Sequence, residues 1–153
     1  MMVLKTLELI SILIAAFVGG MFWGPWLGLT RSLNTFAPDV LIAIVQRMNR
    51  NMSAVMTPML PIALVAMIPV LIASGMVQSA VFATTLAGFA LFLVALLVTM
   101  IIEVPIVKQI VTWTVATLPA NWQQLRDRWG TFHIIRVVAG IGGLVLLLAG
   151  AIF

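Results

Sequence analysis

The sequence has no cysteine, no tyrosine and a single histidine among its 153 residues. Without cysteine, the chain cannot form a disulfide, a thiolate nucleophile, an iron–sulfur cluster or a cysteine-bound zinc site. Without tyrosine, it has no phenolic acid or base. One histidine excludes, within one chain, every metal site that needs two or more imidazoles. A homo-oligomer could escape this limit by gathering His133 from each subunit.

Charged residues are scarce as well, with eight Lys/Arg and four Asp/Glu in a chain that is 63% hydrophobic. A soluble domain of this size has too little core volume to hide so much apolar surface. The net charge of +4 does not indicate nucleic-acid binding, because the basic residues lie at the ends of apolar runs rather than on a water-facing patch. We therefore expect an integral membrane protein that has membrane lipid as a partner.

Four apolar stretches have the roughly 20 residues that a helix needs to cross a bilayer. No charge occurs from Asn51 to Ile102, about twice that length, and Ser74-Gly75 with Gln78-Ser79 marks a turn inside it. The first stretch resembles a signal peptide at its start, but it continues to full spanning length, so we expect it to be retained. The predicted fold is an all-α, single-domain bundle of four transmembrane helices, covering 1–153, with spans near 7–29, 52–74, 77–104 and 132–153.

An even number of spans places both polar connections, residues 30–51 and 104–131, on one side of the membrane. That side holds seven of the eight basic residues and all five tryptophans, whereas the other side has only Lys5. The positive-inside rule then places the connections in the cytoplasm and both termini outside. We expect the bacterial inner membrane. Asp39 could cap a short helix before the second span, and Asn121 could cap the helix of the fourth.

Five residues before the last apolar run are spaced 4, 3, 4 and 3, and so share one face of a helix: Trp122, Arg126, Trp129, His133 and Arg136. His133 could be an acid, a base or a ligand beside arginines that hold an anionic substrate. Alternatively, the arginines extend to lipid phosphates and His133 only caps the interface.

Glu103 ends the third span, where an unpaired carboxylate would be costly. It could pair with Arg126 or Arg136, or serve as a protonatable base or a metal ligand. Before the second span, Gln46 and Asn49 could orient a carbonyl or quinone-like substrate through hydrogen bonds. For these two the alternative is helix capping.

The second span contains three prolines, Pro58, Pro61 and Pro69, and kinks there would widen the bundle into a cavity. Four methionines recur along the same helix at spacings of 4, 4 and 3: Met48, Met52, Met56 and Met59. Such a stripe is typical of adaptable packing around an apolar pocket, while a soft copper site is the alternative. Gly140, Gly142 and Gly143 predict close helix approach.

The pattern Glu103-x-Pro105, then Arg126-x-x-Trp129-x-x-x-His133-x-x-Arg136, resembles the anthrone oxygenase-like family of small four-helix membrane proteins. Gln46-x-x-Asn49 also resembles that family's pattern. Members include fungal proteins linked to the oxidation of anthrones to anthraquinones. The chain departs from the family at Val107, where many members have asparagine, so the resemblance implies the fold more firmly than the reaction.

The resemblance and the polar residues together favour a membrane oxidoreductase that acts on a lipophilic phenol, anthrone or quinol. Glu103 or His133 would abstract a proton, Arg126 and Arg136 would stabilise the oxyanion, and O₂ would react without a protein-derived cofactor. Gln46, Asn49, Trp122 and Trp129 would bind the substrate. We expect Glu103, Asn49, His133 and Arg136 to converge on one cavity at the loop-rich face, roofed by Trp122 and Trp129.

Two other functions fit the sequence. The chain could be a non-enzymatic accessory or scaffold subunit, in a homo-oligomer or a larger membrane complex, with the polar cluster as a structural ion-pair network. It could also bind copper or haem through His133 and Glu103, with methionines as further copper ligands.

Overall fold

The computed structural model describes residues 2–75 and 78–153, and within them it is helical, without strands. Four helical segments are long and apolar enough to cross a membrane, which confirms the predicted all-α transmembrane bundle. The elements follow one another as α1 (Met2–Gly28), η1 (Thr30–Thr35), α2 (Pro38–Gly75), α3 (Ser79–Val98), η2 (Thr99–Glu103), α4 (Val104–Ile110), η3 (Val115–Thr117) and α5 (Trp122–Ile152).

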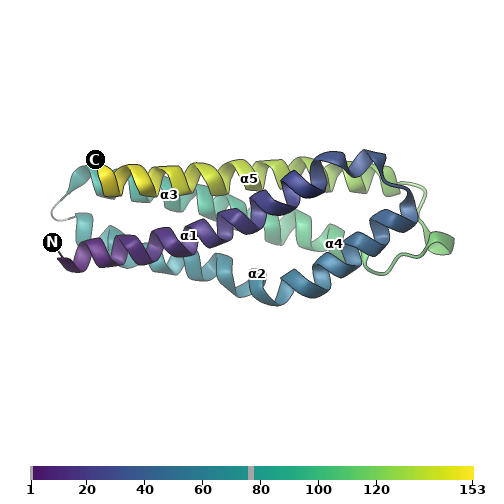
Figure 1. Cartoon of the computed structure of the whole chain (residues 1–153), viewed down its shortest axis with the longest axis horizontal. Helices are drawn as coiled ribbons and strands as arrows, with labels where there is room; N and C mark the ends of the chain where they lie inside the picture. The colour runs from purple at the N-terminus through teal and green to yellow at the C-terminus, as the bar shows by residue number, and fades with distance from the viewer. Residues whose placement is uncertain (1, 76–77) are drawn as a thin grey trace.

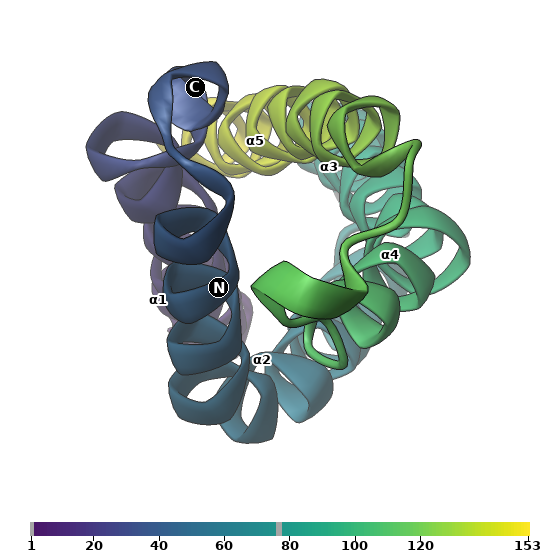
Figure 2. The same ribbon diagram turned by 90° about the vertical axis from the view of Figure 1, so that its right-hand side faces the viewer.

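The long helices form a ring in which α1 packs against α2, α2 against α3, α3 against α5 and α5 against α1 (Figure 2). Both polar connections lie at one end of this ring, while the start of α1 and the end of α5 lie at the other (Figure 1). This is the expected arrangement of an even number of spans. It brings the polar ends of α2, α4 and α5 to the same end of the molecule.

Helix α2 differs from the prediction, which separated a short capped helix from a span beginning near residue 52. The structure has one helix from Pro38 to Gly75, because residues 46–52 contain no glycine or proline to end it. Proline at the first position and Asp39 in the first turn suit a helix start. Figure 1 shows that α2 bends near its middle, in keeping with prolines inside the helix at Pro58 and Pro61. The predicted turn and the predicted start of the third span touch residues 76–77, which lie outside the described residues.

The third helical segment also exceeds its predicted end at residue 104, because α3, η2 and α4 run on without a break to Ile110. Its middle section, η2, is a π-helical turn in which the N–H of Val104 donates to the carbonyl of Thr99. The wider turn comes just before Pro105, which has no N–H to continue the regular ladder. Glu103 is the last residue of this turn and is buried.

Two apolar clusters hold the bundle together. One fills the middle of the ring and includes Phe22, Leu60, Met67 and Phe92. The other lies at the loop end, where Leu41 and Ile110 pack with Trp113 and Trp129. Buried tryptophans thus contribute to an ordered cap over the end of the ring that holds the polar connections.

Asn121 precedes α5 as predicted, but its side chain makes no capping hydrogen bond.

Gly140 of α5 lies against Phe22 of α1, and a Cβ atom at this position would be 2.8 Å from the ring carbon Cδ2. We expect Gly140→Ala to lower the free energy of unfolding by about 1–3 kcal/mol, because an added methyl group must displace a buried ring. Gly20→Ala is the matched control, since a Cβ there meets no heavy atom within 4 Å. Both variants gain the same helix propensity, so the difference between their melting temperatures in detergent reports the contact with Phe22. Equal melting temperatures would contradict this packing.

Candidate functional site

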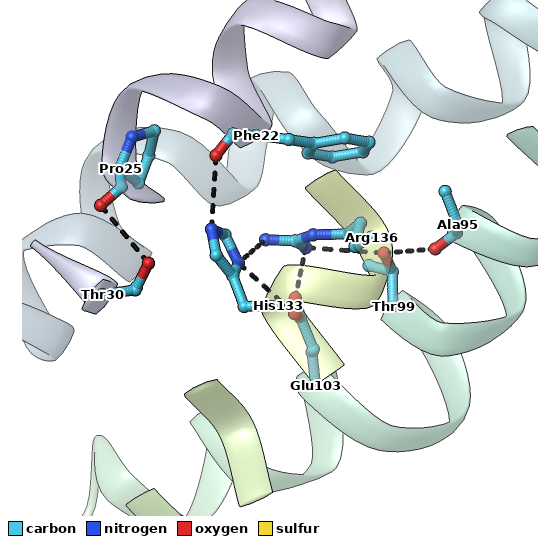
Figure 3. Close-up of polar contacts among 8 residues, drawn as sticks. All are labelled: Phe22, Pro25, Thr30, Ala95, Thr99, Glu103, His133 and Arg136. Carbon is cyan, nitrogen blue, oxygen red and sulfur yellow. Dashed lines mark hydrogen bonds and ion pairs between the residues drawn. The ribbon is translucent and has the colours of Figure 1, made fainter. Parts of the chain in front are cut away.

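A buried ion pair joins η2 to α5 near the loop end of the bundle. Nη1 of Arg136 contacts Oε2 of Glu103, and the side chain of Glu103 is 4% exposed. Nη1 also donates to Oγ1 of Thr99 at 3.4 Å, and Thr99 in turn donates to the carbonyl of Ala95 at 2.7 Å (Figure 3). A buried pair of opposite charges avoids the cost of an isolated charge at membrane depth.

His133, one turn before Arg136, is 1% exposed, and its two ring nitrogens have different partners. Nε2 lies 3.2 Å from the carbonyl oxygen of Phe22, and Nδ1 lies 2.7 Å from Nη2 of Arg136 (Figure 3). A carbonyl oxygen only accepts hydrogen bonds and a guanidinium only donates them. These partners therefore favour the neutral tautomer, with its hydrogen on Nε2 and the lone pair of Nδ1 directed at Arg136.

Helix α1 closes the cluster through a single residue. The carbonyl of Phe22 fixes His133, and the ring of Phe22 lies under Arg136, with the guanidinium carbon 4.6 Å from the ring centroid. A cation over an aromatic face is favourable, the more so when both are removed from water. Gly140 packs on the same ring, so the contact between α1 and α5 also sets the position of Arg136.

The cluster leaves hydrogen-bonding capacity unused. Within the described residues, Oε1 of Glu103 and Nε of Arg136 are buried without a hydrogen-bond partner. Oε1 lies 3.4 Å from Nδ1 of His133, but that nitrogen carries no hydrogen in the favoured tautomer. Buried polar groups are satisfied in the great majority of cases, so an exception calls for an explanation such as a catalytic role or a bound group. One acceptor and one donor are thus left over.

A cavity of about 400 Å³ adjoins this cluster. Its walls are mostly apolar, and five methionines contribute to them: Met21, Met48, Met52, Met56 and Met100. The polar side chains include those of Asn49, Thr99, Glu103, His133 and Arg136. Ligand pockets are typically about 300–1,000 Å³, mostly apolar, with a few polar groups that fix orientation. The cavity has the size and character of a site for an apolar molecule with a polar end.

Five of the eight predicted site residues line this cavity: Asn49, Glu103, Trp129, His133 and Arg136. The other three are not among its lining residues. Nε of Arg126 bonds to Asp127 at 2.8 Å, and its guanidinium stacks on Trp122. Gln46 donates to the carbonyls of Val111 and Trp113, and so ties α2 to the loop after α4. Glu103 pairs with Arg136 and not with Arg126.

Sequence reasoning missed several residues of the site. Thr99 could have been found, because it lies four residues before Glu103 on the same helix face. Phe22 could not, because its backbone carbonyl is a partner that any residue type provides. Pro58 and Pro61 do not line the cavity, but their neighbours Thr57 and Leu60 do. Three methionines of the predicted stripe, Met48, Met52 and Met56, also line it.

A second buried carboxylate, Glu8, lies at the opposite end of the bundle and is 5% exposed. Its Oε2 is 3.1 Å from Nζ of Lys5. With Ser11 and Thr85 it lines a separate cavity of only about 10 Å³. This space is close to the minimum for a single water molecule, so Glu8 is no counterpart of the large site.

His133 and Glu103 are the residues that could hold a metal at the large cavity. Among the described residues, no group of three or more His, Asp or Glu side chains is placed to bind an ion. A metal would need methionine sulfur or water for its remaining positions, and both ring nitrogens of His133 already have partners.

The comparisons with known proteins point to one family. No curated protein and no solved structure matches the chain. The family model described as anthrone oxygenase matches residues 46–146, which include all eight predicted site residues. This match covers more than half of the sequence and includes all of α3 and most of α2 and α5. The chain therefore belongs to the anthrone oxygenase family.

Proposed function

We propose that the protein oxidises a lipophilic, weakly acidic aromatic compound, such as an anthrone, a phenol or a quinol, in the cavity beside Glu103. The observation that carries this proposal is a buried Glu103–His133–Arg136 cluster next to an apolar cavity of about 400 Å³. Membership of the anthrone oxygenase family supports the same substrate class. The polar cluster would meet the acidic group, while the methionines and Trp129 would contact the rings.

Glu103 is the proposed general base, because its Oε1 has no hydrogen-bond partner in the described part of the chain. When Glu103 takes a proton, negative charge moves from the carboxylate to the substrate oxygen. Both groups would lie beside Arg136, so the net charge of the site would not change during the step. Fixed charges that stabilise a developing oxyanion are among the largest contributions to catalysis. His133 would hold Arg136 through Nδ1 and thereby keep the guanidinium in place.

For an anthrone, the reaction balances with O₂ as the oxidant. The base removes one C–H proton opposite the carbonyl, and the resulting enolate gives its electrons to O₂ as a C–O bond forms. The proton returns to the peroxide oxygen, and loss of water then breaks the O–O bond and the second C–H bond. The products are one anthraquinone and one water per O₂. The chain's own residues would supply only the base and the oxyanion site.

We also propose an orientation and a location. The end of the bundle that carries the polar connections has seven of the eight basic residues, and the positive-inside rule assigns it to the cytoplasm. The two termini would then lie on the outer side of the membrane, which we propose is the bacterial inner membrane. The cavity would lie in the cytoplasmic half of the membrane.

The experiment that tests the proposed function is oxidation by purified protein in lipid nanodiscs. Anthrone, a naphthol and a naphthoquinol are supplied separately in air, and both O₂ uptake and product are measured. We expect O₂ uptake above the spontaneous rate for at least one substrate, with equal amounts of O₂ and anthraquinone if that substrate is anthrone. Rates equal to those of empty nanodiscs with all three substrates would refute the proposal.

A further inference from the structure

The lining of the large cavity is exposed on one side only. Its exposed residues are Ser53 and Thr57 on α2, Met100 on η2 and Lys108 on α4. The lining residues from α1 and α5 are buried or half-buried. The mouth of the cavity therefore lies between α2 and the η2–α4 segment, on the flank of the bundle rather than at its end.

The depth of these residues places the mouth against lipid. From Arg50, the last charged residue of α2, the helix rises roughly 10 Å to Thr57, and from Lys108 back to Met100 the distance is similar. No charged residue lies between Asn51 and Ile102. The hydrocarbon core of a bilayer is about 30 Å thick, so Thr57 and Met100 lie within it, while Lys108 lies at the polar interface.

Local chemistry keeps the mouth open. Serine and threonine are small, and Oγ1 of Thr57 donates to the carbonyl of Ser53 at 2.7 Å, so its hydroxyl needs no other partner in lipid. The same stretch of α2 contains Pro58, where the regular helix ladder is interrupted. A leucine or phenylalanine in place of Ser53 or Thr57 would cover the gap that these small residues leave.

We propose that the mouth between Thr57 and Met100 is a lateral portal, through which an aromatic compound with a weakly acidic hydroxyl enters the cavity directly from the hydrocarbon of the bilayer. The occupant would slide its rings between the methionines and bring its hydroxyl to Glu103 and Arg136, whose Oε1 and Nε have no hydrogen-bond partner in the described part of the chain. Both residues line the cavity, and a phenolic or enolic oxygen can donate to a carboxylate and accept from a guanidinium. The choice of occupant rests on the proposed function, but the route does not.

Photolabelling with 4-hydroxybenzophenone in lipid vesicles tests the portal without any turnover. Excited benzophenone attacks C–H bonds and prefers the carbons next to methionine sulfur, so Met52 and Met56 in the cavity wall are natural acceptors. We expect mass spectrometry to find the label on these two residues, with an excess of 1-naphthol competing. A sulfonated benzophenone, which does not dissolve in hydrocarbon, should leave them unlabelled.

Substitutions at the rim provide the matched comparison. Thr57→Trp should reduce labelling of Met52 and Met56 by roughly tenfold or more, because the indole fills the mouth. Val55→Trp is the control, since Val55 lies on the same helix, is 41% exposed and does not line the cavity. Met100→Trp and its neighbour Ile101→Trp, 67% exposed in the wild type, form a second pair.

Three labelling results would overturn the portal: equal labelling by the sulfonated probe, equal labelling in Thr57→Trp and Val55→Trp, or labelling that 1-naphthol does not reduce. The last result would mean that the probe, like a lipid chain, reaches these residues without filling a saturable site. Portal-dependent labelling without any oxidation would leave the portal standing and refute the proposed function instead. If Thr57→Trp and Met100→Trp left the oxidation rate unchanged, the portal would be refuted and the proposed function would stand.

Discussion

Glu103→Gln is expected to lower the rate of substrate oxidation by about 10²–10⁴-fold, the usual contribution of a positioned general base. Glutamine has nearly the same shape and can still accept a hydrogen bond from Arg136, but its amide cannot take a proton. The loss should appear in the maximal rate, with substrate binding changed much less. The measurement is the initial rate of O₂ uptake in nanodiscs at saturating substrate.

The other buried glutamate provides the control. Glu8 also lies within an apolar helix next to a basic residue, at a contact of 3.1 Å to Lys5, yet it lines only the small cavity at the far end of the bundle. Glu8→Gln makes the same chemical change and should leave the oxidation rate unaltered. If both substitutions reduced the rate equally, loss of a buried ion pair would explain the result and Glu103 would not be the base.

Arg136→Gln is expected to destabilise the protein by about 3–5 kcal/mol, because it leaves the carboxylate of Glu103 buried without its partner. The double variant Glu103→Gln with Arg136→Gln has no buried charge at this position and should recover most of the lost stability. Unfolding in mixtures of mild detergent and SDS, followed by circular dichroism, compares the three proteins. A double variant as unstable as Arg136→Gln would contradict the assignment of the cost to the unpaired carboxylate.

The double variant also separates an enzyme from a scaffold. If the Glu103–Arg136 pair serves only to hold η2 against α5, the stable neutral pair of the double variant should restore both the fold and any cellular phenotype that the single variants lose. If the pair acts on a substrate, stability should return while oxidation stays at the level of Glu103→Gln. The two readouts are independent, so neither result depends on the other.

The fold was predictable because the bilayer imposes its length on the chain. Uncharged runs marked all four helices, and an even number of them brought the polar connections to one end. Helix ends were harder to place. Residues 38–51 include three charged and three amide side chains, yet nothing after Pro38 ends a helix, so α2 begins 14 residues before the predicted span. The π-helical turn at Thr99–Glu103 has no sequence pattern of its own beyond the proline that follows it.

The site was predictable in direction but not in extent. The stripe from Trp122 to Arg136 shares one helix face, which is why Trp129, His133 and Arg136 all reach the cavity. However, this stripe is roughly 21 Å long at 1.5 Å per residue, and the α5 residues that line the cavity run only from Trp129 to Arg136, about half that length. Trp122 and Arg126 therefore lie beyond it and contact each other. A spacing pattern predicts which face of a helix points inward, whereas the part of that face that reaches a cavity depends on where the neighbouring helices end.

The central claim is that Glu103 removes a proton from a substrate held in the cavity, and an anaerobic binding experiment tests it most directly. Without O₂ the reaction stops after proton transfer, and the enolate of anthrone, with its extended conjugation, absorbs at longer wavelength than anthrone itself. We expect the wild-type protein and Glu8→Gln to produce this band on mixing with anthrone, and Glu103→Gln to bind anthrone without producing it. An equal band in Glu103→Gln, or no band in a wild-type protein that oxidises anthrone in air, would contradict the account.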